Sequence, residues 1–147
     1  MMIRALLYGL LGWCTEIVWS ASREKLTGRQ TGWTLRGTTY LWMLPLYGLL
    51  IFLLFEPVHN ALRAWPWPVR GLVYMLGFFG LEYATGWLLR RLIGACPWDY
   101  TIHSRWHVHG LIRLDYAPAW FLAGLGLEQV HDFFVLLTPA ILRALGW

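Results

Sequence analysis

Charge is scarce in this chain of 147 residues. About 25% of the residues in soluble proteins are charged, but here the share is 14%, while 58% of the residues are hydrophobic. A single lysine accompanies 11 arginines, and these are scattered between apolar runs instead of gathering on one polar domain. The composition excludes an ordinary soluble domain and disfavours nucleic-acid binding. It is typical of a bilayer protein, and the many aromatic rings near the ends of the apolar runs suit the headgroup layer.

Several motifs are missing as well. Cysteine occurs twice, as Cys14 in an apolar run and Cys96 in a loop, so the chain has neither a CxxC zinc pattern nor a disulfide framework. The phosphate-binding pattern GxxxxGK(S/T) is absent, and any ATP-driven role would therefore need a separate ATPase subunit. Glu16 interrupts the first apolar segment and no A-x-A-like cleavage site follows it. We therefore expect a retained membrane helix, not a removed signal sequence.

Long hydrophobic runs are what the chain does contain. A helix needs about 20 mainly apolar residues to cross the hydrocarbon core, and four segments qualify, roughly 3–22, 38–56, 71–93 and 117–137. The last of them could run on towards Leu145, although Pro139 should kink it or end its first part, because proline lacks an amide donor and clashes with the preceding turn. Residues 138–147 would then form an interfacial tail. The sequence predicts an all-α integral membrane bundle of four transmembrane helices with short loops, forming a single membrane domain over residues 1–147.

The basic residues predict an orientation. If the termini share one side, that side carries Arg4, Arg63, Arg70 and Arg143, and the other carries Arg23, Lys25, Arg29, Arg36, Arg90, Arg91, Arg105 and Arg113. Cytoplasmic loops are enriched in lysine and arginine. We therefore expect loops 23–37 and 94–116 to face the cytoplasm and both termini to lie outside, in a multi-pass protein of the bacterial inner membrane.

Acidic residues fall inside the predicted spans, at Glu16, Glu82, Glu128 and Asp132. An ionised carboxylate near the bilayer centre costs about 2.5 to 3.5 kcal/mol, so these side chains should avoid lipid. Small residues share their helical faces and let helices approach closely. The acids could line a cavity for a cation, a proton or a polar ligand, or they could simply pin the helices together. Glu128, His131 and Asp132 have spacing that could also place metal ligands on one face, although the signal is weak.

Histidines gather in the loop ACPWDYTIHSRWHVHG, residues 95–110. His103 and His107 have helical spacing, whereas His107 and His109 have the spacing of a strand or turn, so one regular conformation cannot easily present all three. We predict no metal site in this loop. A metal site formed by these three histidines is the weaker alternative. A ring-rich interfacial hairpin is favoured. A catalytic or gating role is the further alternative, in which Asp99 and Tyr100 fold back against the acids of the first and third spans.

Four motifs carry a resemblance to a known family. They are GWCTEIVWSA, LRGTTYLWMLPLYG, GLEYATGWLLRRLIGACPWDYT and HGLIRLDYAPAWFLAGLGLEQ, in this order along the chain. Together they resemble transmembrane protein 229 and its bacterial relatives, which are grouped as CmpB-like ABC-transporter permeases. The resemblance implies that the family pattern falls on Glu16, Arg36, Gly37, Pro45, Tyr47, Gly48, Glu82, Thr85, Gly86, Trp87, Trp98, Asp99, Tyr100 and Gly110. The text HVHG departs from the bacterial pattern, where asparagine commonly precedes the glycine, and this argues against a family-wide metal role.

The candidate pocket combines the family positions with the intramembrane acids. Glu16, Glu82 and Asp99 are expected to converge, and Arg36 is expected to pair with Asp99, because a guanidinium can bind a carboxylate through two parallel hydrogen bonds. Such a pair could lock the two loops over a cavity opening. The full set of pocket candidates is Glu16, Arg36, Tyr47, Glu82, Thr85, Trp98, Asp99, Tyr100 and Glu128.

The leading interpretation is a transporter or permease-like component for a small polar solute or ion. One alternative is a membrane-embedded enzyme acting on a lipid or polyprenyl substrate, with Glu82 or Asp99 as general acid or base. Its weakness is that Ser20, Thr85 and Thr101 lack an adjacent base in the sequence. The other alternative is a structural or accessory subunit. Four spans are few for an autonomous path, so a homodimer or a larger membrane complex is expected within the bilayer, with no cofactor and no nucleic acid.

Overall fold

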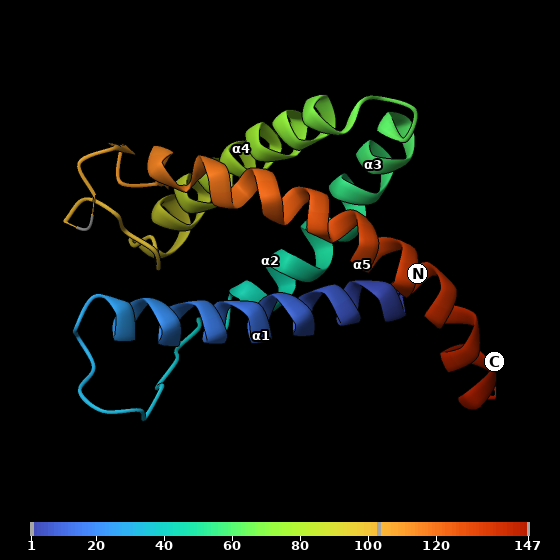
Figure 1. The fold of residues 1–147 in the computed structure, drawn as a ribbon, viewed down its shortest axis with the longest axis horizontal. Coiled ribbons are helices and arrows are strands. Elements are labelled where there is room, and N and C mark those ends of the chain that lie inside the picture. Colours follow the sequence, from blue (N-terminus) through green and yellow to red (C-terminus); the bar gives the residue numbers. More distant parts are fainter. Residues whose placement is uncertain (1, 103, 147) are drawn as a thin grey trace. The chain divides into compact units, whose positions relative to one another are not determined.

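The computed structural model describes residues 2–102 and 104–146 and is all-α apart from one short hairpin (Figure 1). Four helical segments are long and apolar enough to cross a membrane, Met2–Leu26, Met43–Leu62, Trp67–Ile93 and Leu114–Ala144. The chain divides into two compact units, one comprising residues up to Pro57 together with those from Phe134, and the other Val58–Phe133. The boundaries fall inside helices α3 (Glu56–Leu62) and α5 (Ala117–Ala144), so each of these helices contributes to both units.

The first unit rests on close packing of α1 (Met2–Leu26) against α2 (Met43–Leu50). Two glycines lie where these helices cross. A side-chain carbon added at Gly48 would stand 2.6 Å from the carbonyl oxygen of Ala5 and 3.7 Å from the Cα of Gly9. Small residues allow such close approach, on which helix association in lipid depends. The loop 27–42 returns beside α1, where the Thr38 amide donates to the Ser20 hydroxyl (2.8 Å) and that hydroxyl donates to the Thr38 carbonyl (2.9 Å).

A π-helical turn, η1 (Ile51–Phe55), joins α2 to α3 within the second apolar segment. The amide of Glu56 bonds to the carbonyl of Ile51, five residues back, which is the π-helical pattern. Pro57 follows directly and has no amide hydrogen, so an α-helical bond to the carbonyl of Leu53 cannot form. The wider turn therefore lies where a regular α-helix would lose a bond.

The second unit contains α4 (Trp67–Ile93) and the part of α5 up to Phe133, which pack side by side and antiparallel (Figure 1). Gly124 lies directly against Tyr74, and the rings of Phe78 and Trp120 have their centroids 5.2 Å apart. Gly94 ends α4 in the left-handed conformation, with φ of 77°. The connection then forms a hairpin from β1 (His107–Val108) and β2 (Ile112–Arg113), followed by the short helix η2 (Leu114–Tyr116).

The predicted number of membrane-spanning helices is confirmed, but the ends of the segments differ from the predicted ranges. The second segment starts at Met43, because residues 33–39 are non-helical and lie beside α1, and it continues past Glu56 to Leu62. The expectation that Pro139 ends the last helix is wrong, since α5 continues to Ala144. Thr138 donates its hydroxyl to the carbonyl of Phe134 (2.6 Å), one residue before the carbonyl of Val135, which Pro139 leaves without its α-helical donor. Residues 138–144 are therefore helical, not a separate tail.

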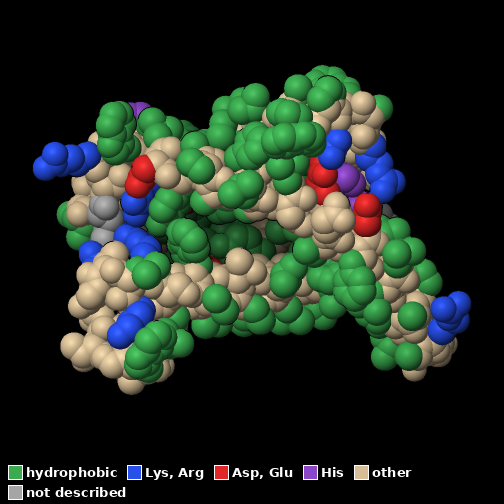
Figure 2. Space-filling view, in the orientation of Figure 1, with side chains coloured by type: hydrophobic (Ala, Val, Ile, Leu, Met, Phe, Trp, Pro, Cys, Tyr) green, Lys and Arg blue, Asp and Glu red, His purple; other side chains and the backbone are tan. Residues whose placement is uncertain are grey.

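The surface is predominantly apolar along the helices, with lysine and arginine side chains mainly near the helix ends (Figure 2). Large side chains in the helix middles point outward, and Leu76 on α4 is 63% exposed while Leu136 on α5 is 78% exposed. Exposed leucines at such positions would be costly in water over a large contiguous area. They are suited to contact with lipid, in agreement with a multi-pass membrane protein.

Candidate functional site

Glu82, on α4, forms the first of two polar clusters in the second unit. The Tyr100 hydroxyl, from the loop after α4, donates to Glu82 Oε1 at 2.6 Å. Glu82 Oε2 and the indole Nε1 of Trp120, which lies near this carboxyl group on the first turn of α5, are both buried. Neither atom has a hydrogen bond of normal geometry among the described residues. The indole N–H nevertheless lies close enough to the Glu82 carboxyl group to act on it as a donor.

The loop that supplies Tyr100 is held against α4 by its own aromatic residue and a glycine. Trp98 is buried and its indole Nε1 donates to the carbonyl of Leu111 (3.2 Å), while a side-chain carbon at Gly86 would stand 3.1 Å from the Cys96 sulfur. The Tyr100 amide donates to the Gly110 carbonyl (2.8 Å). The part of the loop that carries the family pattern is therefore packed against α4. This packing positions Tyr100 for its hydrogen bond to Glu82.

Within the second unit Asp99 is paired with Arg90, and its predicted pairing with Arg36 stays a prediction. Arg90 Nη2 lies 3.3 Å from Asp99 Oδ2, and both residues belong to the second unit. Arg36 lies in the first unit, where its main chain bonds to the side chain of Gln30. Sequence analysis missed Arg90 because it was counted only as an orienting charge, although it stands one turn before the end of α4, level with the loop. Thr101 was expected to lack an adjacent base, but its hydroxyl donates to the carboxylate oxygen Oδ1 of Asp99 (2.5 Å).

The pKa of Asp99 is lowered from its usual 3.8, chiefly because the hydroxyl and amide of Thr101 donate to the carboxylate, with Arg90 adding positive charge nearby. A lowered pKa in the folded protein means that the bonds stabilise the loop above about pH 3.8 and lose their effect as pH falls through the lower folded value. Replacing Asp99 by alanine should therefore lower the protection factor of the Thr101 amide at neutral pH, whereas the wild type should lose this protection only in acid. Hydrogen exchange with mass spectrometry measures it. Unchanged protection in the variant would contradict this assignment.

The remaining predicted site residues lie in different surroundings. In the first unit Glu16 accepts hydrogen bonds from Thr39 (2.6 Å) and Tyr47 (3.4 Å). In the second unit Thr85 donates its hydroxyl to the carbonyl of Leu81 in its own helix (2.7 Å), so it takes no part in the Glu82 cluster. Among the predicted pocket residues, Tyr47 is thus hydrogen-bonded to Glu16 and Tyr100 to Glu82. Convergence of Glu16 with Glu82 and Asp99 on one cavity stays a prediction.

The described histidines of this loop do not converge on a common point. The ring nitrogen Nδ1 of His107 accepts from the Gly110 amide (3.0 Å), and Nδ1 of His109 lies 2.8 Å from the Tyr83 hydroxyl. His103 lies outside the described residues. The hairpin predicted for this stretch is present as β1 and β2.

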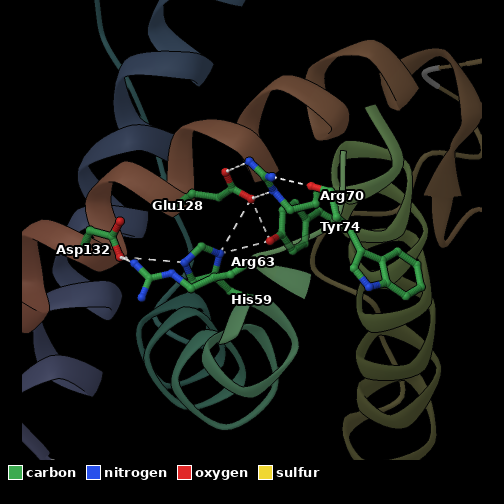
Figure 3. Close-up of polar contacts among 7 residues, drawn as sticks. His59, Arg63, Arg70, Tyr74, Glu128 and Asp132 are labelled. Atoms are coloured by element: carbon green, nitrogen blue, oxygen red, sulfur yellow. Dashed lines mark hydrogen bonds and ion pairs between the residues drawn. The ribbon is translucent and has the colours of Figure 1, made fainter. Parts of the chain in front are cut away.

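A second cluster joins α3, α4 and α5 in the second unit (Figure 3). Glu128 is 5% exposed and receives two hydrogen bonds from Arg70, at 2.7 Å and 2.9 Å, and one from the Tyr74 hydroxyl at 2.8 Å. His59 lies between the two acids of α5, with Nδ1 3.6 Å from Glu128 Oε1 and Nε2 3.8 Å from Asp132 Oδ1. Glu128 falls midway along α5, but its partner Arg70 belongs to the first turn of α4, so this cluster lies near the α3–α4 turn.

Sequence analysis recognised the acids of this cluster but missed their partners. Arg70 was counted as an orienting charge and His59 was not considered. A third cluster lies in the first unit, and its acid was not among the predicted ones: Glu56 receives two hydrogen bonds from Arg4 (2.9 Å and 3.0 Å) and one from Tyr8 (3.0 Å). The available signal was that Arg4 and Arg70 stand within one turn of the end of a predicted span, where they can reach an acid on a neighbouring helix.

An open groove runs along the outer side of α1 and is lined by Cys14, Thr15, Val18, Trp19 and Ser22. It contains none of the predicted acids. The acid-lined pocket expected from the sequence therefore stays a prediction.

Comparison with known proteins gives one family. The model of a family described as "Putative ABC-transporter type IV" matches residues 5–144, which include the first two clusters and all of the third except Arg4. The CmpB-like resemblance of the four motifs is confirmed by this match, whereas the likeness to transmembrane protein 229 stays a prediction. No solved structure matches the chain.

Proposed function

The chain belongs to the family described as "Putative ABC-transporter type IV", and from this we propose that it is a permease-like membrane component whose Glu82 cluster binds a small polar solute or cation. The observation that carries the proposal is the buried carboxyl group of Glu82, whose Oε2 has no hydrogen bond of normal geometry among the described residues, with the buried Trp120 Nε1 near it. A ligand that offers a donor or positive charge to the carboxylate would satisfy the acid. A ligand that also offers an acceptor to the indole would satisfy both.

The position of the cluster supports the proposal. Glu82 stands within the third membrane-spanning segment, while its partner Tyr100 comes from the loop after that segment. An intramembrane acid without an arginine or lysine bonded to it is costly. Such residues therefore usually mark a transport pathway or a ligand site. By contrast, Glu56 and Glu128 each receive two hydrogen bonds from an arginine, as expected of acids that pin helices together.

The basic residues at two helix ends support the proposed orientation, with loops 23–37 and 94–116 in the cytoplasm. Arg23 and Lys25 lie in the last turn of α1, and Arg90 and Arg91 lie in the last turn of α4. Cytoplasmic loops and the helix ends beside them are enriched in lysine and arginine. Since GxxxxGK(S/T) is absent from the sequence, ATP-driven transport would need a separate ATPase, and we propose a homodimer or a larger complex in the bilayer.

Ligand binding to the purified protein tests this function. We expect at least one of sodium, potassium, ammonium, methylammonium, choline or glycine to raise the melting temperature of the wild type, because a ligand that binds only the folded state stabilises it. Glu82→Gln should weaken this binding at least about tenfold, since a hydrogen bond to a charged group contributes about 1.5 to 3 kcal/mol. Differential scanning fluorimetry in detergent provides the measurement. Equal binding by the variant, or no shift with any of the six solutes, would contradict the proposal.

A further inference from the structure

Two histidines and an aspartate converge in the second cluster. His59 comes from α3, and His131 and Asp132 come from α5. One possible ligand atom from each of these residues lies within 4.8 Å of the other two. Both histidines are buried, at 3% and 4% exposure, and their ring centroids are 4.9 Å apart. Two imidazoles and a carboxylate form a donor set suited to zinc and its neighbours among the divalent transition metals.

The surroundings of His59 fix the way its ring faces this point. Its Nδ1 lies 3.1 Å from the Tyr74 hydroxyl, and that hydroxyl donates its proton to Glu128 Oε1 at 2.8 Å. The Tyr74 oxygen can therefore accept a hydrogen bond from the N–H at Nδ1. In this tautomer the lone pair of Nε2 is on the side of Asp132 (Figure 3). Histidines that bind metals usually donate from the second nitrogen to an oxygen partner of this kind, which sets the tautomer and the ring orientation.

We propose that His59, His131 and Asp132 bind a divalent transition-metal cation, with Tyr74 and Glu128 orienting His59 from behind. Ligand atoms on one tetrahedral zinc ion stand about 3.4 Å apart, given bonds of about 2.0 to 2.1 Å. The 3.8 Å between His59 Nε2 and Asp132 Oδ1 is close to this value. The outer limit of 4.8 Å within the set is longer, so a side chain must rotate inward by about 1 Å when the metal binds. Water would complete the coordination.

Arg63 competes with the metal for Asp132. Its Nη2 lies 2.8 Å from Asp132 Oδ1, the same oxygen that faces His59, and its side chain is 58% exposed in the turn before α4. Because it is exposed, the guanidinium can move into solvent when a cation takes its place. Asp132, whose side chain is 45% exposed, gives the cation a route into the site. Removing Arg63 should therefore strengthen metal binding, which a purely structural role for the cluster would not produce.

Zinc titration of the untagged, chelator-treated protein tests the proposal, with competition against a fluorescent zinc indicator to measure affinity and elemental analysis to count the bound ions. We expect one zinc ion per chain in the wild type. His131→Gln should weaken binding about 100-fold, at the upper end of what even indirect ligand partners contribute. Arg63→Gln should tighten it by up to about fivefold, which is what an exposed competing salt bridge can contribute. His109→Gln is the matched control, because it removes a histidine outside the cluster, and it should bind zinc like the wild type.

The outcomes separate the possible readings of the cluster. If His131→Gln fails to fold, Arg63→Gln still decides, because its side chain is exposed and its loss is tolerable. Unchanged or weaker zinc binding by Arg63→Gln would overturn the proposal. So would an equal loss of binding in His109→Gln and His131→Gln, which would assign the metal to scattered surface histidines. Absence of zinc binding by the wild type would leave the cluster as a network of hydrogen bonds and ion pairs, and would also overturn it.

Discussion

Gly48→Leu is expected to lower the free energy of unfolding by about 3 kcal/mol, the upper part of the usual range for overpacking. The reason is that α1 and α2 cross at Gly9 and Gly48 with no space between their backbones. A first side-chain carbon at Gly48 would already stand 2.6 Å from the carbonyl oxygen of Ala5, and a backbone atom cannot rotate away as a side chain can. The leucine would push the two helices apart and remove the contacts on which the first unit depends.

The matched control is Gly77→Leu on α4, since nothing lies within 4 Å of a side-chain carbon added there. Both changes insert the same leucine into a membrane-spanning helix, and both remove a glycine that weakens helix propensity. Thermal unfolding in detergent micelles, followed by near-UV circular dichroism, measures the difference. Gly77→Leu should melt at or slightly above the wild type. Equal melting of the two variants would show that the crossing seen at Gly48 does not hold the first unit together.

The fold was largely predictable because lipid imposes a length and a composition on every crossing helix. A window of about 20 apolar residues is enough to find all four membrane-spanning segments. Their ends were harder to predict, because hydropathy does not show that Pro57 follows a π-helical turn or that the last helix continues through Pro139. These depend on which hydrogen bonds the chain can replace, and a hydropathy window contains no information about them.

The candidate site was predictable only in part. Helical position alone singles out Glu82, and the loop motif brings Tyr100 to it. Partners far apart in the sequence could not be assigned, because the register of one helix against another depends on packing that a single sequence does not show. Arg70 and Glu128 are 58 residues apart, and they meet only because the first turn of α4 lies beside the middle of α5. His59 was missed for the same reason.

The second large effect is expected at Glu82. Removing the charge with Glu82→Gln keeps the size of the side chain and an acceptor for the Tyr100 hydroxyl, so the loop should stay in place. The neutral amide cannot attract a cation or accept from a charged donor as the carboxylate does. We therefore expect a folded protein with the melting temperature of the wild type and no transport. The control is Glu24→Gln, the same change at an acid near the end of α1, which should leave transport unchanged.

Solute counterflow in proteoliposomes tests the central claim most directly, because it needs no energy source and therefore no ATPase partner. Vesicles loaded with an unlabelled solute that binds the wild type are diluted into the radiolabelled solute, and uptake is followed over time. We predict rapid exchange by the wild type and by Glu24→Gln, and exchange by Glu82→Gln no faster than in protein-free vesicles. Exchange by folded Glu82→Gln at the wild-type rate would contradict the assignment of Glu82 as the site through which the solute passes.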